Sequence, residues 1–106
     1  SWTIPKGNIE TAFTASGSAA KEAFEEAGIK GQVIKPNVGF YEYKKHNRIH
    51  RVKVFLMTVS QELSQWPEQA FRTRKWVDVD TSLTLLARKK LKKLIKKVDF
   101  KTVSAI

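Results

Sequence analysis

The segment KEAFEEAGI at residues 21–29 constrains this chain more than any other, because it brings three glutamates together near the end of one helix. Thr14 is a suitable N-cap and Gly28 a suitable left-handed C-cap, so the pattern predicts a helix over 15–27. At about 100° per residue, the three carboxylates fall on one side and small apolar residues on the other. We expect the apolar side to pack on a sheet and the carboxylates to point outward.

These like charges oppose folding unless something neutralises them. Carboxylates three and four residues apart repel by a few tenths of a kcal/mol per pair, and the helix macrodipole disfavours negative charge near its C-terminus. A hard divalent cation such as Mg²⁺ would offset this cost, since it prefers oxygen ligands and keeps positions for a substrate's phosphates. A solvated acidic stripe, neutralised by Lys21 and Lys30, is the alternative that spacing alone leaves open.

Composition bounds the class of protein. With 106 residues, 42% of them hydrophobic, the chain is expected to form a single domain over 1–106 with a modest core. The chain has no cysteine, which excludes a disulfide framework or a thiolate metal site. No apolar run approaches the roughly 20 residues that cross a bilayer, so we expect no membrane association and a cytoplasmic location. A formal net charge of +10 indicates an anionic partner.

Hydrophobic patterns elsewhere predict an α+β chain. Apolar clusters predict strands over 2–4, 32–36, 38–43, 52–59 and 74–79. Polar stretches predict a hairpin loop over 44–51 and a loop over 61–69. Asp80 or Thr81 is expected to cap one last helix. Its apolar face would consist of Leu83, Leu86, Leu91, Leu94, Ile95 and Val98. The Lys-rich opposite face is expected to be solvated, although it could bind RNA through phosphate contacts.

Gly7 and residues 21–29 together resemble the Nudix box. That family pattern is Gly, five residues, Glu, seven residues, Arg-Glu, an aliphatic, any residue, Glu-Glu, any residue, Gly and an aliphatic. The spacing from Gly7 to the glutamate pair fits without a gap. Phe13 stands where the family has its first Glu, and Lys21 stands where it has Arg. Lys21 keeps the charge but lacks the bidentate fork of arginine.

The resemblance covers about residues 2–98 and extends beyond the box. Segments 2–7, 50–51, 63–68 and 72–76 are similar to the diphosphoinositol polyphosphate phosphohydrolase branch and its bacterial relatives. This resemblance implies a Nudix-type α/β/α sandwich with a mixed sheet, here lacking the N-terminal strand pair. A sheet edge left unpaired by the absent strands is expected to favour a homodimer.

The resemblance also implies an activity, a cofactor and roles for particular residues. Nudix enzymes hydrolyse phosphoanhydride bonds, and the branch implies a highly phosphorylated substrate: a diphosphoinositol polyphosphate, a dinucleoside polyphosphate or a nucleoside diphosphate linked to another group. Glu22, Glu26 and a main-chain carbonyl near Lys6 would ligate Mg²⁺ or Mn²⁺. Glu25 would be the general base, although family members differ over which glutamate acts, so Glu22 is also a catalytic candidate. Glu62 or Glu68 could add a loop ligand. The phosphate-binding candidates are Arg48, His50, Arg72 and Lys90, with Lys21 and Gly7 in supporting positions.

Two alternatives remain open from the sequence. One is a Nudix-fold module that binds phosphorylated ligands or RNA without hydrolysing them, suggested by Phe13, Lys21 and the absent strands. The other is a small basic nucleic-acid-binding domain unrelated to Nudix proteins, which the match to the box argues against.

Overall fold

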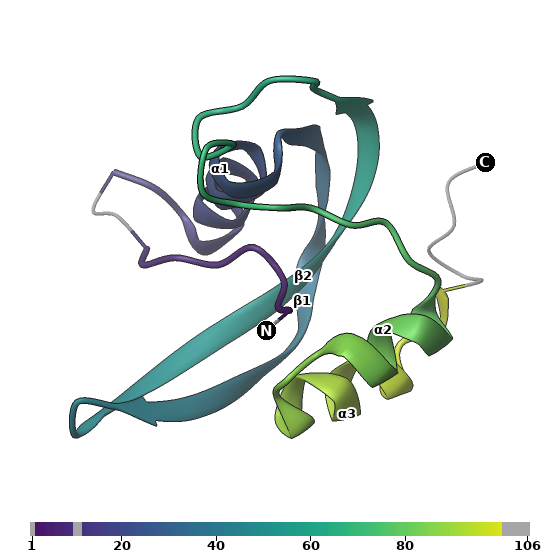
Figure 1. Cartoon of the computed structure of the whole chain (residues 1–106). Coiled ribbons are helices and arrows are strands. Elements are labelled where there is room, and N and C mark those ends of the chain that lie inside the picture. Colours follow the sequence, from purple (N-terminus) through teal and green to yellow (C-terminus); the bar gives the residue numbers. More distant parts are fainter. Residues whose placement is uncertain (1, 10–11, 101–106) are drawn as a thin grey trace.

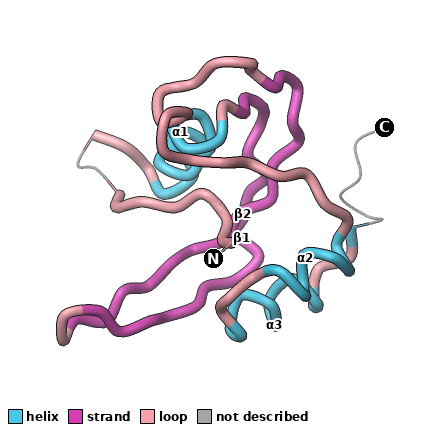
Figure 2. Tube along the Cα trace, in the orientation of Figure 1, coloured by secondary structure: helices cyan, strands magenta, loops and turns pink. Residues whose placement is uncertain are grey.

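A long antiparallel hairpin and three helices make up the described part of the chain, residues 2–9 and 12–100 of the computed structural model (Figure 1). The elements in order are α1 (Ala15–Ala27), β1 (Ile29–Lys45), β2 (Arg48–Glu62), α2 (Val79–Leu85) and α3 (Lys89–Lys97). Helix α1 lies near one end of the ribbon formed by β1 and β2, whereas α2 and α3 lie together away from α1 (Figure 2). The expected α+β class is confirmed. No helix in the described ranges is both long enough and apolar enough to cross a membrane.

Helix α1 has the bounds and both caps that the sequence predicts. The Thr14 side chain accepts a hydrogen bond from the Gly17 N–H at 3.0 Å, and Gly28 ends the helix at φ 66°. One expectation is wrong: the glutamates do not all point outward. Glu26 is buried together with Ala27, because the N-terminal segment passes over this side of the helix.

Strands β1 and β2 are longer than expected, and the turn between them is shorter. His46 and Asn47 both have positive φ, as a two-residue type I′ turn requires, and pairing resumes at once between Lys45 and Arg48. The hairpin expected over 44–51 is confirmed, but its loop is shorter than expected, since only residues 46–47 lie outside the strands. The strands expected over 32–36 and 38–43 form one strand, with a register shift between Ile34 and Gly39 that spans a proline unable to donate to the ladder.

The second half of the chain departs most from the prediction. Residues 72–78 form no strand, and α2 begins at Val79 because the Asp78 side chain accepts from the Thr81 N–H at 2.7 Å. The cap expected at Asp80 or Thr81 is therefore wrong, and the one expected helix is two, α2 and α3. Residues 2–4 contribute only an isolated parallel bridge from Trp2 to Leu86. Within the described ranges the sheet is a two-stranded antiparallel ribbon rather than the expected mixed sheet.

The core joins the ribbon to α3 and the end of α2. Tyr41 and Val54 of the ribbon pack with Leu86 and Leu91, and Leu91 is only 1% exposed. Helix α3 is thus fixed by a few apolar contacts, and its lysines remain outside. The start of the lysine-rich helix α3 therefore lies near the N-terminal segment, since Ala87 and Arg88 line a cavity together with Trp2, Thr3 and Lys6.

We expect Gly28→Ala to destabilise the fold by roughly 2 kcal/mol. The left-handed backbone disfavours alanine, and an added Cβ would lie 2.9 Å from Arg74 Nη1 and 2.9 Å from Trp66 Cβ. Urea denaturation measures the loss. Gly28→Asn separates the two causes, because asparagine tolerates this backbone but brings the same Cβ. A Gly28→Ala protein as stable as the parent would contradict the close approach.

Candidate metal and phosphate site

Two glutamates of α1, one turn apart, form the centre of the candidate site. The Lys6 main-chain N–H donates to Glu26 Oε2 at 2.9 Å, and the Glu22 carboxyl lies close enough to that of Glu26 to raise its pKa. Gly7 lies directly on Glu22, since a Cβ at this glycine would come within 2.5 Å of Glu22 Oε1. A side chain at position 7 would therefore displace the Glu22 carboxylate, whereas glycine leaves it in place beneath the N-terminal segment.

The environment of the pair favours a shared proton or a bound cation. Burial and, after it, the neighbouring Glu22 carboxyl raise the pKa of Glu26 to about 7, against the opposing effects of the Lys6 N–H and Arg72. Two carboxylates in contact cannot both ionise freely, so a proton or a cation must offset their repulsion.

The donors present fit Mg²⁺. Within the described ranges no three His, Cys, Asp or Glu side chains converge as a ready-made metal cluster. The donor set is instead the carboxylate pair of Glu22 and Glu26. Mg²⁺ is commonly held by one or two carboxylates and completes its octahedron with water and substrate phosphates. The pair therefore has the chemistry of a site that the substrate helps to complete.

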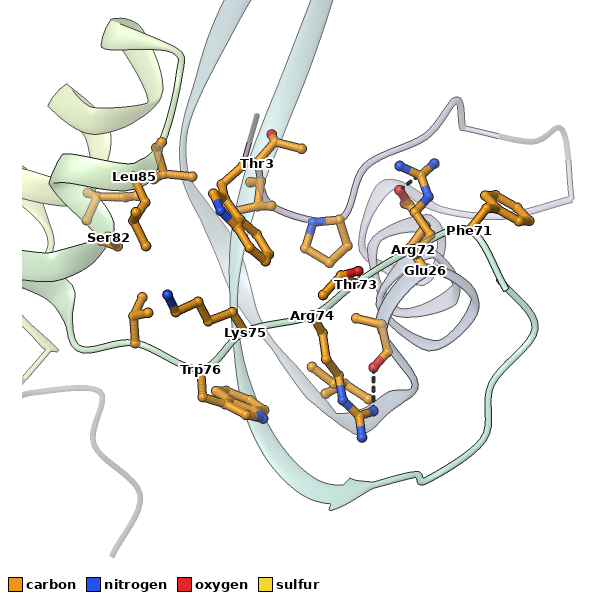
Figure 3. A pocket seen from close by; sticks show the side chains of 18 residues that line it. Thr3, Glu26, Phe71, Arg72, Thr73, Arg74, Lys75, Trp76, Ser82 and Leu85 are labelled. Carbon is orange, nitrogen blue, oxygen red and sulfur yellow. Dashed lines mark hydrogen bonds and ion pairs between the residues drawn. The ribbon is translucent and has the colours of Figure 1, made fainter. Parts of the chain in front are cut away.

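Arg72 lies beside this pair (Figure 3). Its Nη2 is 3.2 Å from Glu26 Oε1, and its Nε donates to Glu68 Oε1 at 3.0 Å. Glu68 is thus brought to the same side as Glu26, and its own N–H donates to the Glu25 carbonyl at 3.0 Å. Glu62, the other loop candidate, pairs with Arg74 at 3.3 Å instead. Of the two, Glu68 shares an arginine with the carboxylate pair.

Glu25 is held apart from the pair by the neighbouring lysine. Lys21 Nζ lies 2.8 Å from Glu25 Oε1, and both side chains are partly exposed. The same ammonium lies 5.9 Å from the centre of the Phe13 ring. The two residues that depart from the Nudix box are therefore neighbours in space. Lys21 orients Glu25 with a single ion pair.

The remaining predicted phosphate ligands do not converge on the carboxylates. The side chains of Arg48 and Lys90 are exposed and make no hydrogen bond or ion pair with the described residues. His50 stacks on Tyr43, with ring centres 5.0 Å apart. Tyr43 in turn contacts Lys6 and Arg88, so His50 belongs to a second, cationic cluster. Arg72 alone among the four has a polar contact with a member of the pair.

Two residues that fix the end of α1 were not anticipated in this role. Trp66 Nε1 donates to the Glu26 carbonyl at 3.0 Å, and Arg74 Nη1 donates to the Ala27 carbonyl at 2.8 Å. The guanidinium stacks on the indole at 4.1 Å. Helix C-termini leave carbonyls free and favour positive charge, so both contacts stabilise the helix that carries the glutamates. Trp66 and Arg74 lie far along the chain from the end of α1, so no local sequence pattern predicts these contacts.

A cavity of about 660 Å³ adjoins Glu26 and Arg72. Figure 3 shows Trp76, Lys75 and Arg74 along one wall, with the Arg72–Glu26 ion pair at one end. The cavity therefore offers aromatic and cationic surface next to the carboxylates. Its lining suits a molecule with anionic groups and an apolar or ring-shaped part.

A carboxylate pair on a capped helix, a glycine loop lying on it and an adjacent arginine define a candidate site for a divalent cation and phosphate. Residues 1–98 match the NUDIX domain, and the chain belongs to the Nudix family. It is 38% identical over 84 residues to Nudix hydrolase 21, chloroplastic, of Arabidopsis thaliana, covering 77% of this chain and 42% of that protein.

The resemblance to the Nudix family that the sequence indicates is confirmed. Its resemblance to the diphosphoinositol polyphosphate phosphohydrolases is confirmed by a second kind of relative. The chain is 33% identical over 87 residues to diphosphoinositol polyphosphate phosphohydrolase 2 of Rattus norvegicus, covering 80% of this chain and 47% of that protein. It is also 40% identical over 79 residues to Nudix hydrolase 4 of Arabidopsis thaliana, covering 73% of this chain and 38% of that protein. The chain spans less than half the length of these relatives.

Proposed function

We propose that this chain carries the catalytic site of a metal-dependent pyrophosphohydrolase, which cleaves a phosphoanhydride bond by attack of water. The observation that carries the proposal is the contact of Glu22 and Glu26 beneath the Lys6-Gly7 segment, with Arg72 beside them. Phosphoryl transfer needs charge neutralisation and an oriented nucleophile more than a covalent partner. The site offers residues for both.

Each residue has a distinct role in this proposal. Glu22 and Glu26, with the main-chain carbonyl at Lys6, would hold Mg²⁺ or Mn²⁺, and the bound ion would supply positive charge to the phosphates. Arg72 would turn from Glu26 to a phosphate oxygen, where its planar fork suits bidentate capture. Glu25 would accept the proton of the attacking water, and Lys21 would orient it through their ion pair.

A highly phosphorylated small molecule is the substrate class that we propose. The formal charge of +10 and the cationic wall of the large cavity favour a polyanion. One relative is named for diphosphoinositol polyphosphates, so these compounds come first, followed by dinucleoside polyphosphates and nucleoside diphosphates linked to another group. Arg48, His50 and Lys90 would meet outlying phosphates. A cytoplasmic location also remains a proposal, since relatives carry chloroplastic and mitochondrial names.

The test is phosphate release from these three substrate classes, with and without Mg²⁺. We expect release from at least one class, only with the metal, and a loss of a hundred-fold or more in Glu25→Gln, as is typical when a general base is removed. Glu62→Gln is the matched control, because Glu62 pairs with Arg74 and not with the carboxylate pair. Absence of release from every class, or full activity in Glu25→Gln, would count against the proposal.

One observation favours a second candidate function, a module that binds phosphorylated ligands or RNA without hydrolysis. The ion pair with Lys21 already occupies Glu25, and a run of exposed or half-exposed cations covers α3. These cations are Arg88, Lys89, Lys90, Lys92, Lys93, Lys96 and Lys97. Such a module would bind without metal, keep its affinity in Glu25→Gln and lose affinity steeply with salt. We also propose a homodimer, because within the described part of the chain both strands of the two-stranded ribbon have an unpaired edge. Sedimentation at several protein concentrations tests this proposal.

A further inference from the structure

We propose that Lys6 and Arg88 form a second anion subsite, which holds a phosphate of the substrate remote from the bond that is cleaved. This inference rests on the proposed function and adds to it a feature that selects for longer phosphate chains. The subsite is a cavity of about 380 Å³, lined by Trp2, Thr3, Lys6, Ala87 and Arg88, which shares Trp2 and Thr3 with the larger cavity.

An aromatic ring, rather than a carboxylate, holds the two cations in place. Lys6 Nζ is 3.2 Å from the Tyr43 hydroxyl and 5.0 Å from the ring centre, and Arg88 Cζ lies 4.0 Å from the same ring centre. His50 stacks on Tyr43. Among the described residues no carboxylate lies within ion-pair distance of Lys6 or Arg88. Two cations that line one cavity, with no counter-ion among the described residues, favour an anion in that cavity.

Stacking leaves the charged donors available. A guanidinium or ammonium over an aromatic face is attracted by the ring's quadrupole and keeps most N–H groups free for a ligand. Arg88 is also the N-cap residue of α3, and no side chain caps that helix end. The free N–H groups and the macrodipole of this nine-residue helix add to the positive potential around Arg88.

A buried tyrosine lies next to this cluster, since the ring centres of Tyr41 and Tyr43 are 6.4 Å apart. Tyr41 is 2% exposed, and its hydroxyl makes no hydrogen bond with the described residues. Thr3 and Arg88 both line the cavity, and both act to lower the pKa of Tyr41. Burial raises the pKa of Tyr41, so the hydroxyl stays protonated and able to donate. A buried hydroxyl without a hydrogen-bond partner carries a desolvation cost.

Lys6 connects this subsite to the carboxylate pair. Its main-chain N–H donates to Glu26, and its side chain reaches Tyr43 on the other side of the segment. A phosphate chain with one group at the carboxylate pair could therefore extend along Lys6 and place a further group against Arg88. A substrate with too few phosphates would fill only one of the two positions.

Calorimetric titration with inorganic tripolyphosphate, pyrophosphate and orthophosphate, with and without Mg²⁺, tests the subsite. We expect tripolyphosphate to bind the parent protein most tightly, and Arg88→Gln and Lys6→Gln each to weaken its binding about ten-fold, as removal of a charged hydrogen-bond donor does. Binding of orthophosphate should change much less. Lys6→Gln keeps the hydrogen bond from the main-chain N–H of residue 6 to Glu26. Any loss of tripolyphosphate binding in this variant therefore comes from the missing side-chain ammonium.

Lys93→Gln is the matched control, because it removes one exposed charge from α3 without touching Tyr43. The inference is overturned if Lys93→Gln weakens tripolyphosphate binding as much as Arg88→Gln, or if both subsite variants bind it as the parent does. Thermal unfolding shows whether Arg88→Gln is folded, and Lys6→Gln gives an independent answer. If hydrolysis occurs but does not depend on Arg88, the proposed function is supported and the subsite is not. If binding depends on chain length but no substrate is hydrolysed, the subsite is supported and the proposed function is not.

Discussion

Glu26→Gln is expected to stabilise the metal-free protein at neutral pH and to lower its hydrolytic activity a hundred-fold or more. The glutamine keeps the size of the side chain and an oxygen for the Lys6 N–H, but removes the charge that is buried against Glu22. The same change removes a proposed metal ligand, and losing one such electrostatic contact costs on the order of 10²–10³ in rate. Stability and activity should therefore move in opposite directions.

The pH dependence of stability reports on Glu26 directly. Its pKa rises from the ordinary 4.5 to about 7 on folding, so the folded state binds more protons than the unfolded state between these values. Stability from this group is complete below pH 4.5 and is lost as the pH rises toward 7. Without metal, the parent should lose roughly 3 kcal/mol over this window. Glu26→Gln should show a flat profile, and added Mg²⁺ should restore the parent's stability at pH 7 and above.

Urea denaturation at a series of pH values, with Mg²⁺ or with a chelator, measures both effects. Glu62→Gln serves as the control, since Glu62 is 46% exposed and contacts Arg74 rather than the pair. Its profile should match the parent's. A Glu26→Gln protein with the parent's slope, or with full hydrolytic activity, would remove Glu26 from the centre of the site.

Local signals in the sequence were sufficient for α1 and insufficient for the hairpin. Thr14 and Gly28 act on their own neighbours, so the helix has the expected bounds. The turn at His46 and Asn47 was hidden in a polar, basic stretch that is typical of a loop. Recognising a two-residue turn there would have paired Tyr43 with His50 and revealed the cationic cluster. The strand expected over 74–79 has no pairing partner in the described ranges, and a capping aspartate starts a helix instead.

In the candidate site, too, local spacing predicts some features and misses those that depend on distant segments. Spacing on one helix identified Glu22 and Glu26, because residues four apart are always neighbours there. The burial of Glu26 was not foreseen, since it depends on a segment twenty positions away that folds back over the helix. The contacts of Trp66 and Arg74 with the end of α1 span 40 and 47 positions. Periodicity carries no information about such contacts, and only the resemblance to a family indicated a role for Arg72.

Leu91→Ala is expected to destabilise the protein by about 2–5 kcal/mol, the usual range for a buried leucine. Leu91 is 1% exposed and packs with Tyr41, Val54 and Leu86, so the truncation would remove buried apolar contacts and leave a cavity in this cluster. Urea denaturation measures the loss. Ile49→Ala is the control, because Ile49 is 72% exposed and should change stability by less than about 0.5 kcal/mol.

The position of Leu91 also links the core to the proposed anion subsite. Arg88 lies one turn before Leu91, and the guanidinium reaches Tyr43 only while α3 stays packed on the ribbon. At temperatures where Leu91→Ala is still folded, tripolyphosphate binding should weaken together with the packing of α3, since the helix that carries Arg88 is loosened. A loss below 1 kcal/mol would mean that α3 contributes little to the core, and unchanged binding would show that Arg88 is held by Tyr43 alone.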